Sequence, residues 1–254
     1  MSVTTTIALA NQKGGVAKTT SVASIGAALA EAGQRVLLVD LDPQGSLTFS
    51  LGLDPEEIDT TVADVLLGKA AAVDAIVTTD EGIDLLAANI SLAEAEENLV
   101  TRTGREQRLR VALAKVADDY DWILLDCPPA LGVLTVGALS AADEVLIPLQ
   151  AETLSHRGVG QLLDTIHDVR QFINTDLVIR GVLPTMYDGR TAHARNVLAA
   201  IGETYDLPVL EPAIPKTIRF AEAPAIGQSI LSTAKNHKGA DAYRAIAQVL
   251  ISGK

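Results

Sequence analysis

The sequence has 254 residues, of which 48% are hydrophobic, 3% aromatic and 20% charged, and its net charge is −12. This length and apolar content suffice for one large core, so we expect a single α/β domain over residues 1–254. The negative charge argues against a protein that coats nucleic acid through its overall field, and a lone cysteine, Cys127, excludes an internal disulfide.

The chain contains no apolar run near the roughly 20 residues that span a bilayer, and no signal-peptide pattern opens it. Together with the cysteine usage, this predicts a protein of a reducing cytoplasm. Only residues 1–5 precede the first expected strand. We therefore expect no N-terminal helix-turn-helix extension.

The first distinctive stretch is 11–20, which follows an apolar run at 7–10 and precedes an alanine-rich helical pattern. It contains the order K-G-G-x-x-K-T-T. A strand that ends in a glycine-bearing turn and leads into a helix leaves several N–H groups unpaired at the positive helix end, so an anion can bind there. The pattern predicts a phosphate-binding loop in which Lys18 reaches the terminal phosphates and the Thr19 hydroxyl ligates magnesium.

This loop differs from the common form G-x-x-x-x-G-K-[ST], because Gln12 and Ala17 occupy the two outer glycine positions. If the second position requires a positive φ, alanine is strained there. The chain has instead an additional lysine, Lys13, before Lys18. This order resembles the deviant Walker A ATPases, the ParA/MinD family, in which the early lysine is the signature residue.

The next expected strand, 35–40, is a near-continuous apolar run, which is typical of parallel strands covered on both faces. Asp40 and Asp42 follow at its carboxyl end, the edge where open α/β sheets bind ligands. We predict that Asp42 positions or polarises the attacking water, and it matches the functional Asp of the family's D-x-D-P-Q stretch. Asp40 is the alternative, with a structural role favoured.

Residues 54–120 are less informative. They predict a short helix at 61–67, a strand at 83–87, and a helical segment at 91–117 that breaks near 103–104. Basic and acidic residues alternate in that segment, which favours a solvated helix face over a nucleic-acid-binding helix. The basic residues are Arg102, Arg105, Arg108, Arg110 and Lys115, and the acidic ones are Glu94, Glu96, Glu97 and Glu106.

A second chemical landmark is the apolar strand at 122–126, which ends in Asp126 and is followed by two prolines. After a phosphate loop, such a strand is the Walker B arrangement, in which buried aliphatic residues hold a carboxylate near the metal, directly or through water. The D-C-P-P spelling also resembles the family.

The remaining chain continues to alternate strands and helices, without an internal repeat, so we predict a doubly wound, mainly parallel sheet flanked by helices. A proline-dense segment at 207–216 is not expected to be regular. The expected strands lie at 143–149 and 178–184, and the expected helices at 155–172, 192–205 and 239–251.

The resemblance covers nearly the whole chain and is strongest for the short chromosomal ParA, or Soj-type, proteins. It rests on Q-K-G-G-V-x-K-T-T, V-L-L-V-D-L-D-P-Q-G, I-L-L-D-C-P-P, M-Y-D-x-R-T and I-R-F-A-E-A-P. It implies a P-loop NTPase of the deviant Walker A type that hydrolyses ATP with magnesium, slowly and under stimulation by a ParB-like partner.

The resemblance also implies the site residues. Lys13, Lys18 and Asp42 are the expected catalytic residues, and Thr19 and Asp126 the expected magnesium ligands. Met186 and Pro215 are candidates for the adenine pocket. The loop residues that would bind the nucleotide are Lys13, Gly14, Gly15, Val16, Ala17, Lys18, Thr19 and Thr20.

In the family, the signature lysine crosses into the partner's site, so the resemblance implies an ATP-dependent homodimer. It further implies binding to DNA without sequence preference, hence nucleoid association, through Arg190, Lys216 and Arg219. These lie in the C-terminal third, where residues 180–254 hold nine Lys/Arg and six Asp/Glu, a net charge of +3.

Three rival functions remain open. A MinD-type membrane-positioning ATPase would need a basic amphipathic C-terminal helix. Residues 243–254 contain only Arg244 and Lys254 as cations. We therefore expect a core helix there and no stable membrane association. A metal-cluster carrier of the nitrogenase iron-protein kind would need more cysteines than Cys127. An orphan ParA-like scaffold that positions a protein cargo is the third.

Overall fold

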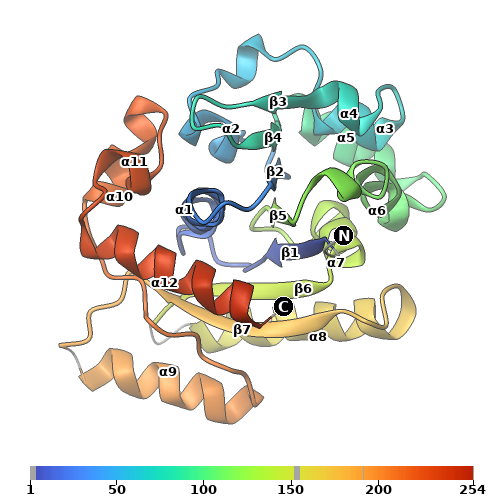
Figure 1. Ribbon diagram of the computed structural model, residues 1–254. Helices are drawn as coiled ribbons and strands as arrows, with labels where there is room; N and C mark the ends of the chain where they lie inside the picture. Colours follow the sequence, from blue (N-terminus) through green and yellow to red (C-terminus); the bar gives the residue numbers. More distant parts are fainter. Residues whose placement is uncertain (1–3, 152–154, 191, 254) are drawn as a thin grey trace.

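A single seven-stranded sheet organises the molecule (Figure 1). The computed structural model describes residues 4–151, 155–190 and 192–253, with the side chains of 155–157 and 192–193 left out. The strand order is β3-β4-β2-β5-β1-β6-β7, and every neighbouring pair is parallel except β3 and β4. The strands are β1 (Thr5–Leu9), β2 (Val36–Asp40), β3 (Ile76–Thr78), β4 (Asp84–Leu86), β5 (Trp122–Asp126), β6 (Glu144–Gln150) and β7 (Val178–Thr185).

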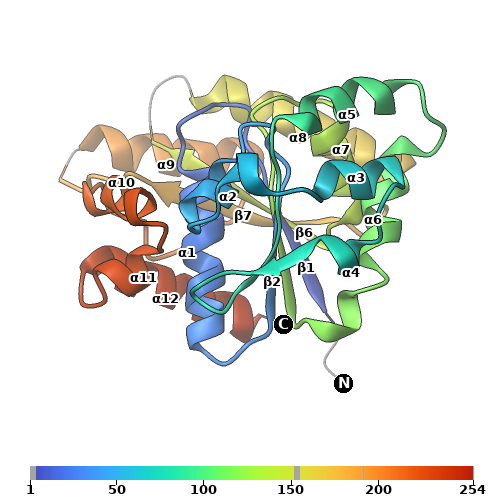
Figure 2. The same ribbon diagram turned by 90° about the horizontal axis from the view of Figure 1, so that it is seen from above.

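Helices cover both faces of the sheet (Figures 1 and 2). The described helices are α1 (Lys18–Glu31), α2 (Ser46–Ser50), α3 (Val62–Leu67), α4 (Ala72–Ala75), α5 (Ser91–Val100), α6 (Arg108–Leu113), α7 (Val133–Ala141), α8 (Ser155–Phe172), α9 (Ala192–Tyr205), α10 (Arg219–Glu222), α11 (Ile230–Thr233) and α12 (Lys238–Ser252). The predicted doubly wound, mainly parallel sheet is confirmed.

Two hydrophobic clusters lie on opposite faces of the sheet because successive strand side chains point in opposite directions. In β1, Ile7 and Leu9 join the cluster that contains α1, α11 and α12, whereas Ala8 joins the cluster of α3 and α5 to α9. The central strands β1, β2 and β5 are almost fully buried. Such double coverage explains their near-continuous apolar sequences.

The predicted break in the region 91–117 is confirmed, since α5 and α6 are separate helices and Gly104 between them has φ 69°. The predicted short helix at 61–67 begins with a capping box, in which Thr61 accepts from Ala63 N–H and Asp64 accepts from Thr61 N–H. α7 was not expected from the sequence.

Three arginines of the basic run have a structural role in addition to facing solvent. The Nη1 atoms of Arg102 and Arg108 donate to the carbonyls of Leu67 and Leu66, each at 3.0 Å. Arg105 donates to the Val100 carbonyl at the end of α5. These side chains satisfy the carbonyls that a helix leaves unpaired at its C-terminus.

The proline-dense segment is not a regular strand or helix, as expected. It runs beside the end of β7 and forms two isolated parallel bridges, Val209 with Val182 of β7 and Pro215 with Tyr187 just beyond it. Val182 N–H donates to the Pro208 carbonyl and Leu210 N–H to the Val182 carbonyl, both at 2.8 Å. The prolines lack N–H donors, so the pairing is interrupted and 207–216 forms a broken strand at the sheet edge.

The apolar face of α12 is part of the core, as expected. Tyr243 and Ile246 are fully buried, and the Tyr243 hydroxyl lies 2.9 Å from Ser21 Oγ of α1. At the other end of the helix, Arg180 Nη2 donates to the Val249 carbonyl at 3.1 Å. No helix in the described part of the chain is long and apolar enough to cross a membrane.

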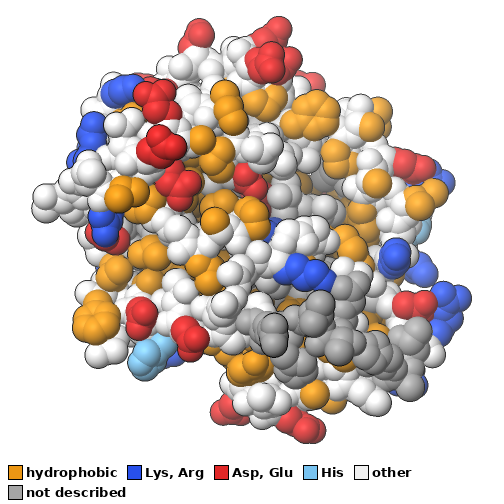
Figure 3. Space-filling model, turned by 180° about the vertical axis from the view of Figure 1, so that it is seen from behind, with side chains coloured by type: hydrophobic (Ala, Val, Ile, Leu, Met, Phe, Trp, Pro, Cys, Tyr) orange, Lys and Arg blue, Asp and Glu red, His pale blue; other side chains and the backbone are white. Residues whose placement is uncertain are grey.

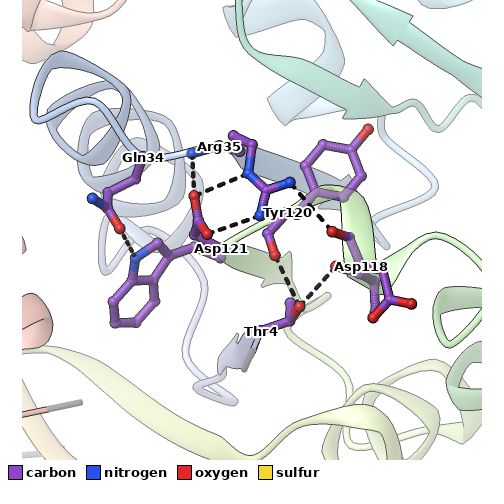
Figure 4. Close-up of polar contacts among 8 residues, drawn as sticks. Thr4, Gln34, Arg35, Asp118, Tyr120 and Asp121 are labelled. Carbon is purple, nitrogen blue, oxygen red and sulfur yellow. Dashed lines mark hydrogen bonds and ion pairs between the residues drawn. The ribbon is translucent and has the colours of Figure 1, made fainter. Parts of the chain in front are cut away.

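A polar network ties the strands together at their amino ends, opposite the predicted loop (Figure 4). Arg35 Nη2 and Asp121 Oδ1 lie 3.0 Å apart, and Arg35 Nη1 donates to the Asp118 carbonyl at 3.2 Å. Thr4 Oγ1 donates to the Tyr120 carbonyl at 2.8 Å. These contacts within the chain join the amino ends of β1, β2 and β5.

Candidate active site

The predicted phosphate loop connects the carboxyl end of β1 to α1, on the far side of the sheet in Figure 1 (Figure 2). Gly15 has φ 73°, and Ala17 has φ 62° and ψ 35°, so both are left-handed. The concern about a strained alanine is therefore confirmed. No described side chain caps α1, which leaves the N–H groups of its first turn available to an anion.

Two side chains fix this loop to neighbouring strands. Asn11 Nδ2 donates to the Pro148 carbonyl of β6 at 2.7 Å, while its Oδ1 accepts from Lys13 N–H at 2.9 Å. Thr185 Oγ1, at the end of β7, donates to the Val16 carbonyl at 2.9 Å. Sequence reasoning missed both roles, and Thr185 carries no local signal because its partner is 169 positions away.

Lys18 and Thr19, the first residues of α1, lie near Asp126 at the end of β5. Lys18 is 8% exposed and Asp126 is fully buried. Burial, followed by the charge of Asp40, raises the pKa of Asp126 well above its usual range, and Thr19 and Lys18 offset part of this rise. Neither carboxylate oxygen of Asp126 has a hydrogen bond of normal geometry within the described part of the chain.

A buried carboxylate without a full set of donors fits a divalent cation, since hard cations prefer oxygen ligands. Thr19 and Asp126 are the residues that would hold it, directly or through water. A magnesium ion there would neutralise charge on the phosphate oxygens. Cys127, the next residue, is buried, and burial raises the pKa of its thiol, which makes it a packing residue instead of a nucleophile.

The two carboxylates after β2 have different surroundings. Asp40 is buried and accepts from Thr48 N–H and Thr48 Oγ1, both at 2.9 Å, and from Asp42 N–H at 3.1 Å. Burial still raises the pKa of Asp40 to about 6. Asp42 is half-buried and accepts from Gln44 N–H at 3.0 Å. Asp40 thus orders the loop, and Asp42 remains the more accessible carboxylate.

Most of the residues predicted to contact adenine and DNA lie around the end of β7. Met186 has φ 49°, and Tyr187 N–H donates to the Ile214 carbonyl at 2.9 Å, which places Pro215 beside this turn. Arg190 and Lys216 line one groove of about 560 Å³ together with Pro215.

Arg219 does not line this groove and begins α10, where its Nη1 lies 2.8 Å from Glu222 Oε2. The structure therefore brings two of the three predicted DNA-binding cations together and leaves the third apart. It also adds a cation that sequence reasoning missed, Lys238 at the start of α12, which shares the groove.

The loop at a strand's carboxyl end, the uncapped helix start and the buried carboxylate define a P-loop nucleotide-binding fold. Residues 4–179 match the family model described as an AAA domain. The chain belongs to this family, and specifically to the ParA/MinD ATPases that its motifs resemble.

Two curated relatives match along nearly their whole length. The sporulation initiation inhibitor protein Soj of Bacillus subtilis (strain 168) is 44% identical over 243 residues, which cover 95% of this chain and 96% of Soj. The chromosome partitioning protein ParA of Caulobacter vibrioides (strain NA1000 / CB15N) is 42% identical over 249 residues, covering 97% of this chain and 93% of ParA.

A similar solved structure is that of cobyrinic acid a,c-diamide synthase from Mycobacterium smegmatis, with an ATP analog and magnesium bound. It is 55% identical, has a TM-score of 0.89, and the match covers 98% of this chain and 95% of that one.

Proposed function

We propose that this protein is an ATP-dependent DNA partition or positioning ATPase. ATP and magnesium bind at the loop and drive formation of a sandwich dimer. This dimer binds DNA without sequence preference. A ParB-like partner stimulates the slow hydrolysis of ATP, and hydrolysis releases the DNA. The observation that carries the proposal is a loop with both Lys13 and Lys18 at the carboxyl edge of this sheet, beside the unsatisfied carboxylate of Asp126.

The residues divide the work within one chain. Loop N–H groups and Lys18 bind the β- and γ-phosphates, and Thr19 and Asp126 hold the magnesium ion, whose charge stabilises the transferred phosphoryl group. Asp42 orients the attacking water, because it is accessible whereas Asp40 is occupied by Thr48 and the Asp42 N–H.

Lys13 serves the partner's nucleotide. It precedes the loop N–H groups, so it is poorly placed for its own γ-phosphate, and the nucleotide becomes part of the dimer interface. The dimer then persists while the γ-phosphate is present and loosens after hydrolysis.

A DNA-retention experiment tests this function. A nonspecific DNA fragment is titrated with the protein in ATP and in ADP, and retention should require ATP and fall steeply with salt. Arg219→Ala should weaken retention. Arg110→Ala, which removes an exposed arginine from α6, should not. Equal retention in ATP and ADP, or none with either, would contradict the proposal.

The name of the M. smegmatis protein suggests a second candidate, an ATP-dependent amide synthase. The only cysteine, Cys127, is buried with a raised pKa, so it is unsuited to release ammonia from glutamine as a thiolate. Phosphate release that requires cobyrinic acid and an ammonia source, and ignores DNA, would favour this candidate.

The MinD-type candidate is disfavoured by α12, whose apolar face packs on α1 and is not available to a lipid surface. The scaffold candidate differs from the main proposal in turnover: it predicts no stimulation of hydrolysis by DNA together with a ParB-like partner.

A further inference from the structure

The groove beside the end of β7 gathers cations from three separate segments. Arg190 comes from the turn before α9, Lys216 from the broken edge strand, and Lys238 from the first residue of α12. Among the described residues that line it, Asp188 is the only acidic one. In a protein with a net charge of −12, such a concentration of positive charge is local and unlike the average surface.

The one described acidic residue of this groove, Asp188, is paired with Arg190. Arg190 Nε donates to Asp188 Oδ1 at 2.9 Å and Arg190 Nη2 to Asp188 Oδ2 at 2.8 Å. These contacts, and to a lesser degree the charge of Lys238, lower the pKa of Asp188 to about 2. The Arg190 side chain is nevertheless 90% exposed, so its fork is held in one orientation while other N–H groups face solvent.

The other two cations of the groove are lysines. Both Lys216 and Lys238 are exposed, and neither makes an ion pair with any residue in the described part of the chain. In Figure 3, which views the molecule from behind, Lys and Arg side chains gather on the right, toward α9, α10 and α12, and most Asp and Glu side chains lie elsewhere.

From this geometry we infer that Lys238 is a phosphate-contacting residue of the DNA-binding surface and completes a three-cation groove with Arg190 and Lys216. The inference rests on the proposed DNA binding. The spaced point charges and one oriented guanidinium fit the repeated phosphates of a nucleic-acid backbone, which need charge at intervals and no base-specific donors.

The test compares Lys238→Ala with Lys235→Ala, its matched control. Lys235 is an exposed lysine three positions earlier that lines a different cavity, beside Glu31 and Glu81, so both variants lose one charge but only one loses it from the groove. Retention of a nonspecific DNA duplex is measured in ATP between 50 and 200 mM salt, which are conventional concentrations for such titrations.

Lys238→Ala should weaken retention about five- to tenfold at about 0.1 M salt and flatten the logarithmic salt dependence by about one unit, as expected for one lost phosphate contact. Lys238→Arg should restore both. Lys235→Ala should change neither, and ATP affinity should stay the same in all three.

Two outcomes would overturn the inference. If Lys238→Ala behaves like Lys235→Ala while Arg219→Ala still loses DNA, the proposed function stands and the role of Lys238 is wrong. If Lys238→Ala weakens ATP binding, and DNA retention falls only as much as ATP binding does, the groove binds the nucleotide and not DNA. Failure of the unsubstituted protein to retain DNA in ATP would instead reject the proposed function.

Discussion

Ala17 is the residue at which this chain departs most clearly from the usual phosphate loop. Its φ of 62° lies in the region that L-residues disfavour by roughly 1–2 kcal/mol. Glycine would fit without strain, but would also give the unfolded chain more freedom, which offsets part of the gain. The loop therefore carries strain next to Lys18, the residue that is proposed to reach the phosphates.

We expect Ala17→Gly to raise the free energy of unfolding by about 0.5–1 kcal/mol, because relief of the strain exceeds the added entropy. Chemical denaturation measures it. The control is Ala30→Gly within α1, the helix that Ala17 precedes. Ala30 has a helical backbone, so this variant should lose about 1 kcal/mol of stability. If both variants are destabilised equally, the left-handed conformation is not a source of strain.

Asp126 is the second residue that lowers the stability of the nucleotide-free protein. Its carboxylate is fully buried and lacks hydrogen bonds of normal geometry among the described residues. Asp126→Asn should stabilise the nucleotide-free protein by about 1–3 kcal/mol, because the buried charge is removed. The same variant should lose the rise in melting temperature that magnesium and nucleotide give together, which thermal unfolding measures.

The pH dependence of stability follows from the same pKa. Because the pKa of Asp126 is raised in the folded state, the folded protein keeps the proton to higher pH than the unfolded chain. The free energy of unfolding of the nucleotide-free protein should therefore fall as pH rises above about 4, and Asp126→Asn should reduce that slope. Identical slopes in both proteins would show that Asp126 keeps its usual pKa.

At the scale of elements, the phosphate loop depends on strands that lie far away in sequence. β7 holds it through Thr185 and β6 through Asn11. The same turn after β7 leads to Met186 and Arg190, so the nucleotide loop and the cationic groove share one support. A substitution at Thr185 should thus alter both the nucleotide loop and the cationic groove.

Thr185→Val should cost about 1–2 kcal/mol of stability and weaken nucleotide binding, because the Val16 carbonyl loses its buried donor. Thr185→Ser keeps the hydroxyl and should restore nucleotide affinity even where some stability is lost. Isothermal titration with ATP under non-hydrolysing conditions measures the affinity. Equal affinities for the Val and Ser variants would contradict an anchoring role.

The sequence was sufficient to predict most strands and long helices, since double coverage makes parallel strands apolar and helices amphipathic. α7 was not predicted because Val133–Ala141 is largely apolar, so its hydrophobic residues do not recur at helical spacing. Two further features were not predicted, because both depend on contacts between distant segments. They are the pairing of 207–216 along β7 and the arginines that cap α3 and α5.

The site divides in the same way. The loop, Asp42 and Asp126 are local patterns at strand ends and could be placed from the sequence, although their roles stay predictions. Thr185 and Lys238 could not, because each acquires its significance only from the residues that folding brings beside it. Arg219 was grouped with Arg190 by resemblance, yet it lies outside the groove.

At the scale of the whole molecule, charge is divided between an acidic N-terminal part and a basic C-terminal third. The division fits a protein that binds DNA only when two copies combine their basic grooves, since one groove in an acidic body gives weak, salt-sensitive attraction. In the proposed function, ATP-dependent pairing is therefore the step on which DNA binding would depend.

The most direct test of this account is analytical sedimentation of the protein and its Lys13→Ala variant in magnesium with ATP or ADP. Lys13→Ala should bind ATP normally and stay monomeric, whereas the unsubstituted protein should form a dimer in ATP and a monomer in ADP. A Lys13→Ala dimer in ATP that matches the unsubstituted protein would contradict the central claim.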